Sequence, residues 1–94
     1  ERVAFRIEAH LTLYSGAAAG DAQRQAEQRL QDWAAQQRRR LGRDLVPSQV
    51  IERLQGVQGV YRVELVQPAF QELTPHQWAD CEDIQVMIVG VANG

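Results

Sequence analysis

The sequence contains no lysine, a single cysteine, few aromatic residues and no long apolar run. One cysteine excludes an internal disulfide, so Cys81 gives no reason to expect an oxidising compartment. No stretch approaches the roughly 20 apolar residues that are needed to span a bilayer. All ten basic residues are arginines, and twelve acidic residues leave a formal net charge of −2. This balance argues against nucleic acid as the main partner, because phosphate binding depends on excess positive charge.

The length of 94 residues suits one small domain and leaves no room for two. Folding at this size buries only roughly 60–65% of the surface of the open chain, so a partner would add stability to a thin core. The sequence starts with Glu1 and passes directly into an alternating pattern, without a signal peptide. We therefore interpret residues 1–94 as a single domain of a longer protein.

The first half of the chain carries a strand pattern followed by a helix pattern. Apolar and mostly polar residues alternate over residues 3–13, which predicts a strand with one solvated face that ends near Gly16. Asp21 is the expected N-cap of the following helix, and Gly42 is its expected C-cap. Between them the apolar stripe of the helix consists of Ala22, Ala26, Leu30, Trp33, Gln37 and Leu41.

The second half predicts a shorter helix and two strands. Pro47 suits the first turn of a helix, and the apolar stripe behind it consists of Val50, Ile51, Leu54 and Val57, with Gly56 and Gly59 as the stop. A strand follows with Tyr61, Val63 and Leu65 on its core face, and Pro68 ends it. Residues 67–80 are expected to be a long loop. Residues 84–89 are apolar on both faces, which predicts a strand buried more fully than the first, and residues 90–94 are expected to be a loose tail.

The order strand, helix, helix, strand, strand predicts an α+β fold. Two helices packed on one face of a three-stranded, mainly antiparallel sheet would form a two-layer sandwich. We expect the last strand to lie between the other two and to pair antiparallel with both, because its sequence is the most apolar.

Three segments, taken in order, resemble a known family. The opening run ERVAFRIEAHLTLYSGA alternates and ends in a Leu-Thr-Leu-Tyr segment and a glycine. Residues 38–68 contain a Leu-Gly-Arg-Asp turn at 41–44, then Gly59-Val60, then an Arg-Val-Glu-Leu strand that ends near Pro68. The closing run HQWADCEDIQVMIVG places Trp78 and Cys81 before an Ile-x-Val strand. Together the segments resemble the C-terminal domain of the baseplate assembly protein J family.

This resemblance implies a non-enzymatic, structural component of a contractile phage-type tail baseplate. The implied partners are other baseplate proteins and copies of the same chain, without nucleic acid, membrane, cofactor or small-molecule substrate. The implied location is the virion tail, with the host cytoplasm as the place of assembly.

The residues with reactive side chains do not form a catalytic or metal-binding pattern. Cys81 has His76 nearby in sequence, but its acidic neighbours would raise the pKa of the thiol rather than lower it. His10 and His76, with Asp80, Glu82 and Asp83, lack the repeated ligand spacing of a zinc or calcium site. We therefore predict no catalytic, cofactor-binding or metal-binding residues.

Four residues are candidates for an interface. Phe70, Leu73 and Trp78 share the long loop, where they either cap an open end of the core or form an apolar surface that docks a neighbour. Arg39 belongs to an arginine run at the end of the long helix, where cations complement the helix dipole. Its planar guanidinium is also suited to a carboxylate across an interface.

A small-ligand-binding regulatory module of a larger enzyme is the alternative function. Such a module needs a pocket with convergent polar groups. The strand–helix junction from Gly16 to Asp21 is the place where we would expect that pocket.

Overall fold

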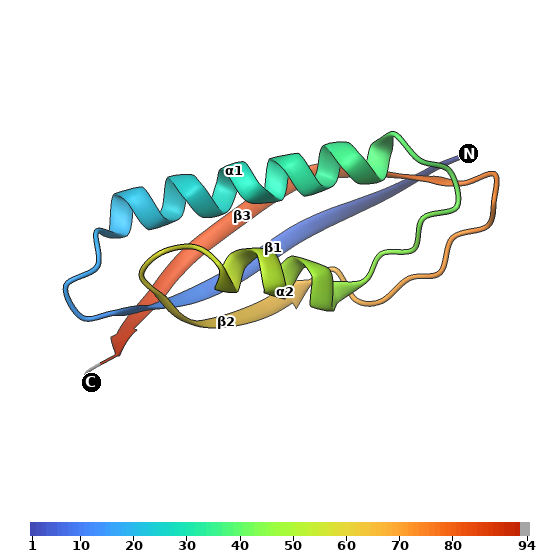
Figure 1. The fold of residues 1–94 in the computed structure, drawn as a ribbon. Coiled ribbons are helices and arrows are strands. Elements are labelled where there is room, and N and C mark those ends of the chain that lie inside the picture. The colour runs from blue at the N-terminus through green and yellow to red at the C-terminus, as the bar shows by residue number, and fades with distance from the viewer. Residues whose placement is uncertain (93–94) are drawn as a thin grey trace.

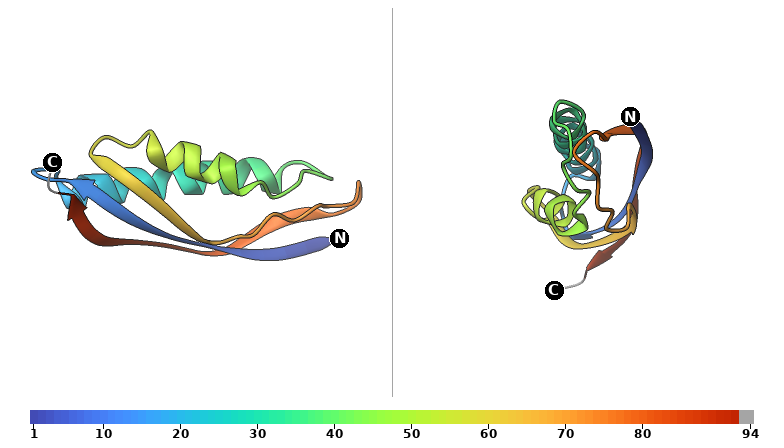
Figure 2. Two further views of the ribbon diagram at one scale, coloured as in Figure 1. Left: turned by 90° about the horizontal axis from the view of Figure 1, so that it is seen from below. Right: turned by 90° about the vertical axis from the view of Figure 1, so that its right-hand side faces the viewer.

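The computed structural model of the protein describes residues 1–92 and contains two helices and one three-stranded sheet (Figure 1). Its elements are β1 (Arg2–Tyr14), α1 (Ala19–Arg38), α2 (Pro47–Gln55), β2 (Val60–Gln67) and β3 (Trp78–Ala92). The predicted α+β fold, with its order of strand, helix, helix, strand, strand, is confirmed. Both helices lie on the same side of the sheet (Figure 2).

The sheet is mixed, and its strand order is β2-β1-β3. β1 pairs antiparallel with β2 and parallel with β3. The expectation of a mainly antiparallel sheet with the last strand in the centre is therefore wrong. Apolar residues on both faces of β3 suggested that both faces are buried. However, Met87, Val89 and Val91 are 50%, 54% and 58% exposed. β3 is an edge strand, and its second apolar row faces away from the core.

The core lies between the inner face of β1 and the two helices. Alternate residues of β1 are buried, as the period of two predicted: Phe5, Ile7, Ala9, Leu11 and Leu13. The predicted stripe of α1 is also buried, from Ala22 to Gln37. The Trp33 ring meets the Phe5 ring edge-on at 5.9 Å between centroids, which joins the helix to the central strand.

Both ends of α1 differ from the prediction. The helix begins two residues before Asp21, and its N-cap is Ala18, which makes no side-chain capping bond. Asp21 instead lies in the first turn and pairs with Arg24. At the other end the helix stops at Arg38, so Leu41 falls outside the stripe. Gly42 is not the C-cap: it sits in the next turn at φ +70°, where an added Cβ would approach the Pro75 backbone to 3.1 Å.

A register shift explains the burial pattern of β2. Thr12 pairs with Arg62, but Leu13 pairs with Val60, so the residue between them has no partner on β1. That residue is Tyr61, and the bulge turns it outward to 51% exposure while Val60 is buried. Tyr61 was predicted on the core face, and the bulge is the reason that it is not.

β3 is longer at both ends than the sequence pattern predicted. It begins at Trp78, so the preceding loop covers residues 68–77 and not 67–80. It continues to Ala92, so the predicted tail from Gly90 is strand over its first three residues. Residues 93–94 of that predicted tail lie outside the described residues.

Gln37 is the buried polar residue of the core. Its exposure is 0%, and neither amide atom has a hydrogen-bond partner among the protein atoms of residues 1–92. Burial of an amide without such partners costs free energy relative to an apolar side chain of the same shape. We expect Gln37→Met to raise the free energy of unfolding by about 1 kcal/mol in a urea titration.

The matched control for this measurement is Gln31→Met, an exposed position on the same helix. Its stability should stay close to that of the parent chain. A Gln37→Met variant less stable than the parent would show that the buried amide is stabilising.

Candidate interaction surface

Two irregular segments close the end of the molecule at which α1 stops. Residues 39–46 follow α1 and residues 68–77 precede β3, and both lie at the end that holds the N-terminus (Figure 1). Leu45 and Gln71 exchange two backbone hydrogen bonds of 2.8 and 3.0 Å. The Gly42 N–H donates to the Gln77 carbonyl at 2.8 Å, and the Leu73 N–H donates to the Asp44 carboxylate at 2.9 Å. The two segments are therefore tied to each other by their backbones.

The four predicted interface residues differ in their placement at this end. Phe70 is 62% exposed, and Arg39 is exposed at the C-cap of α1. Leu73 is only 6% exposed and belongs to the core. Trp78 is half-buried, and the Arg38 guanidinium lies 5.7 Å from its ring centroid. Leu73 and Trp78 are thus buried and half-buried, whereas Phe70 and Arg39 are exposed to solvent.

Leu41 is a surface residue that the sequence pattern missed. It is 63% exposed. Leu41 and Phe70 are the two most exposed large apolar residues of the described chain. The helical spacing placed it on the buried stripe, but α1 ends three residues earlier. The signal that could have found it is the Arg-Leu-Gly-Arg sequence, because Gly42 favours a turn. We define the end surface as the exposed residues Arg39, Arg40, Leu41 and Phe70 of these two segments. Arg43 is half-buried and borders a hollow with Glu52 and Arg53 of α2.

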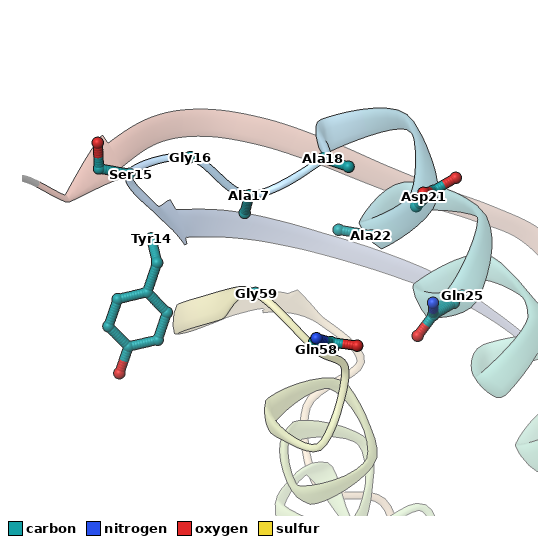
Figure 3. Close-up of a pocket in the computed structure, with 10 residues that line it drawn as sticks. All are labelled: Tyr14, Ser15, Gly16, Ala17, Ala18, Asp21, Ala22, Gln25, Gln58 and Gly59. Atoms are coloured by element: carbon teal, nitrogen blue, oxygen red, sulfur yellow. The ribbon is translucent and has the colours of Figure 1, made fainter.

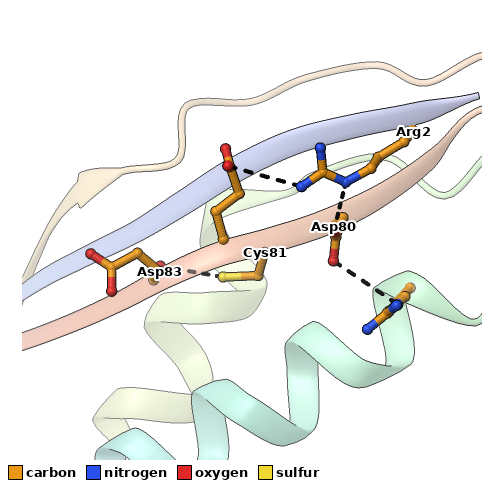
Figure 4. Close-up of polar contacts among 6 residues, drawn as sticks. Arg2, Asp80, Cys81 and Asp83 are labelled. Carbon is orange, nitrogen blue, oxygen red and sulfur yellow. Dashed lines mark hydrogen bonds and ion pairs between the residues drawn. The ribbon is translucent and has the colours of Figure 1, made fainter.

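Asp80 holds two other arginines of this region. Arg2 Nε donates to its Oδ2 at 2.6 Å, and Arg38 Nε lies 4.0 Å from its Oδ1 (Figure 4). The contacts join β1, β3 and the last turn of α1. The hydrogen bond with Asp80 is the main cause that raises the pKa of Arg2. No carboxylate of residues 1–92 is within ion-pair distance of Arg39, Arg40 or Arg43, in contrast to Arg2 and Arg38.

Cys81 lies beside Asp80 on β3 and is half-buried. Its Sγ donates to the Asp83 carbonyl at 3.3 Å (Figure 4). Burial raises the pKa of the Cys81 thiol, and the charges of Asp80 and Asp83 raise it further. Burial is the largest cause of the raised thiol pKa, and the acidic neighbours that the sequence pointed to are a smaller one. A thiol that stays protonated at neutral pH is a poor nucleophile.

Within the described part of the chain, no three His, Cys, Asp or Glu side chains gather closely enough to hold a metal ion. His10 Nε2 lies 3.1 Å from the Glu8 carboxylate on the outer face of the sheet. Neither helix in residues 1–92 is sufficiently long and apolar to span a bilayer.

A shallow hollow of about 460 Å³ lies at the strand–helix junction, the place where the alternative function needed a pocket (Figure 3). It is bordered by the end of β1, the start of α1 and the turn before β2. Its polar side chains, Ser15, Asp21, Gln25 and Gln58, are all exposed. The Asp21 carboxylate already pairs with Arg24. The hollow therefore lacks the buried, fixed polar groups that orient a small ligand.

Comparison with known proteins gives one family. A family model described as the baseplate J-like protein C-terminal domain matches residues 5–87. The match starts in β1, includes α1, α2 and β2 in full, and ends in β3. The chain belongs to this family. The resemblance carried by its three sequence segments is thereby confirmed. No curated protein matches the chain.

Membership gives the baseplate J-like domain a structural role in a phage tail baseplate. Its location is the virion tail, and it assembles there with other tail proteins. The α+β architecture described above is the form in which this chain carries out that role.

The environment of Cys81 predicts slow thiol chemistry. Because burial raises the pKa of the thiol, its reactive thiolate is scarcer than that of an exposed cysteine at the same pH. We expect the iodoacetamide alkylation rate to reach half its maximum at a higher pH than the rate of a short cysteine peptide does. Rates measured by mass spectrometry from pH 7 to pH 10 in the folded chain would test this. A half-maximum below that of the peptide would show an activated cysteine.

Proposed function

We propose that the baseplate J-like domain acts through protein–protein contacts in a contractile tail baseplate and catalyses no reaction. We further propose that it is the C-terminal domain of a longer baseplate protein, that its partners include copies of itself, and that it assembles in the host cytoplasm. The family match over residues 5–87 is the observation that carries the proposal. A structural family is expected to act through its surface.

The chemistry of the chain supports a role without catalysis. Its one thiol has a raised pKa, and no hydrogen bond within residues 1–92 joins Cys81 to a histidine. Nucleophilic catalysis needs an activating base at hydrogen-bond distance and a group that orients that base. Proton transfer and metal chemistry need comparable clusters, and no potential metal cluster occurs in the described residues.

The end surface supports a role in contact formation. Leu41 and Phe70 expose large apolar side chains at 63% and 62%, and arginines surround Leu41 on both sides. Aromatic residues and arginine are enriched where proteins bind one another. The backbone bonds between residues 39–46 and 68–77 hold this surface in one shape before a partner arrives. A contact made by a preformed surface loses less conformational entropy.

The first test is to purify tail particles from an induced culture of the source organism and search them for peptides of this chain by mass spectrometry. We expect the peptides at a small, fixed copy number relative to the tube protein. Ribosomal proteins of the same preparation serve as a control for contamination. Intact, contractile tails without the chain would contradict a baseplate role.

A second test asks whether the end surface takes part in assembly. We expect a chain with Leu41→Ser and Phe70→Ser to keep its circular dichroism spectrum and to lose most of its incorporation into tails, because the apolar contact area is removed. The matched control is Tyr61→Ser with Val66→Ser, which changes two exposed apolar residues of β2. Equal incorporation of both double variants would argue against the end surface as the contact.

A further inference from the structure

β3 has one free edge. The strand order β2-β1-β3 gives β3 the neighbour β1 on one side and no strand on the other within residues 1–92. Two register shifts interrupt its pairing with β1, and the extra residues are Glu82 at the first and Val89 at the second. Between them, residues 84–88 pair with residues 7–11 without interruption. Because bulges disturb the edge of a strand, this regular stretch is the part of β3 that is suited to a further strand.

The backbone of this stretch presents hydrogen-bonding groups to the free edge. Along a strand, the N–H and C=O groups of successive residues point to opposite edges. The Ala92 carbonyl faces β1, because it accepts the Ser15 N–H at 3.2 Å. Counting back from Ala92, with Val89 as the one extra residue, turns the Val86 carbonyl to the free edge. There it accepts a bond of 3.3 Å from the Gln23 side chain of α1. The residues two positions before and after Val86 share its orientation.

The side chains of the stretch are arranged symmetrically about Val86. Val86 is 7% exposed, and Ile84 and Ile88 are partly buried against the same core. When two copies pair antiparallel about Val86, that residue meets its counterpart, and Ile84 lies opposite Ile88 of the other copy. Each of these inner pairs is apolar. A parallel pairing in register would set Asp83 beside its counterpart, and like charges in that position destabilise a sheet.

The helix side of the edge has room for an added side chain. A shallow hollow of about 240 Å³ is bordered by Ala34 and Ala35 of α1 and by Cys81 and Ile84 of β3. The two alanines are small, so the hollow stays open above Ile84. Ile88 of a second copy, opposite Ile84, would enter this hollow and remove apolar surface from water. A two-fold axis makes the contact reciprocal, since each copy supplies one isoleucine and one hollow.

We propose that two copies of the chain join through the free edges of β3, antiparallel and centred on Val86, so that their sheets become one continuous sheet. This proposal rests on the proposed function and specifies the contact between copies. Backbone hydrogen bonds of residues 84, 86 and 88 hold the two edges together, and the Val86 carbonyl exchanges the Gln23 amide for the backbone of the second copy. The contact area is small, so association is weak and reversible.

The first measurement is sedimentation equilibrium of the folded 94-residue chain at about 5 to 500 μM, a range suited to a small interface. We expect a monomer–dimer equilibrium. Ile84→Lys should raise its Kd at least about tenfold, because pairing would place a lysine in an apolar contact. The matched control is Val63→Lys, which changes a partly buried residue on the opposite edge strand, β2, and should leave the Kd unchanged. Circular dichroism checks that both variants are folded.

Disulfide trapping tests the register in chains that also carry Cys81→Ser. Antiparallel pairing about Val86 places Gln85 opposite Met87 of the other copy, with Cα atoms about 4.5 Å apart, which a disulfide can bridge. We expect mild oxidation to link Gln85→Cys chains to Met87→Cys chains much faster than either variant to itself. Both positions are exposed, so the fold is retained. A mixture of Gln85→Cys and Val66→Cys, the latter exposed on β2, should stay unlinked.

Three results would overturn the proposal: a chain that stays monomeric over the whole range, an unchanged Kd for Ile84→Lys, or trapping in the mixture that is no faster than in the single variants. A dimer that Val63→Lys breaks and Ile84→Lys does not would assign the contact to β2. Each of these results leaves the baseplate role intact if tail particles contain the chain. The absence of the chain from intact tails would instead remove the proposed function.

Discussion

β1 is the strand that has a neighbour on each of its edges, and the other elements are arranged around it. Its inner row, with Ile7, Ala9 and Leu11 at 1% exposure or less, needs cover from the helix side. α1 gives this cover with Leu30 and Trp33, and α2 with Val50 and Leu54. Because three strands offer a single buried face, both helices must share one side of the sheet.

The end surface follows from the different lengths over which β2 and β3 pair with β1. β2 pairs with β1 only from Glu8 to Leu13, whereas β3 pairs along the whole of β1. The first half of β1 therefore has one strand neighbour, and irregular chain must complete the core there. Leu45 and Leu73 are the inward residues of that chain and are buried at 0% and 6%. Leu41 and Phe70, on the same two segments, are left pointing to solvent.

The sequence predicted those features that depend on local periodicity. The alternation in β1 and the stripe from Ala22 to Gln37 were identified correctly, because each reports burial along one element. Strand order was not, because it depends on which edges meet. The apolar residues on both faces of β3 suggested a central strand, but Met87 and Val89 face outward at an edge. Two local irregularities also escaped prediction: the bulge that exposes Tyr61, and the early stop of α1 that exposes Leu41.

For the candidate site, the sequence named Phe70, Leu73, Trp78 and Arg39 together as interface candidates. It could not separate Phe70 and Arg39, which are exposed, from Leu73 and Trp78, which are buried and half-buried. That separation depends on the Leu45–Gln71 pairing, which fixes which side of the segment faces the core. The pairing is between residues far apart in the chain, and no local pattern reports it. The family could be recognised from the sequence alone, because the resemblance depends on the order of three short segments and not on tertiary contacts.

Arginine, rather than lysine, is consistent with a domain that has both a thin core and an exposed contact surface. The Arg38 side chain lies over Trp78 and near Asp80, so one planar group covers an aromatic ring and approaches a carboxylate. A lysine there could supply a point charge but not the flat contact. Further along the same run, the guanidinium groups of Arg39 and Arg40 each present several donors in fixed directions. Arg38 thus packs against other parts of the domain, whereas the next residue, Arg39, faces solvent, because α1 ends between them.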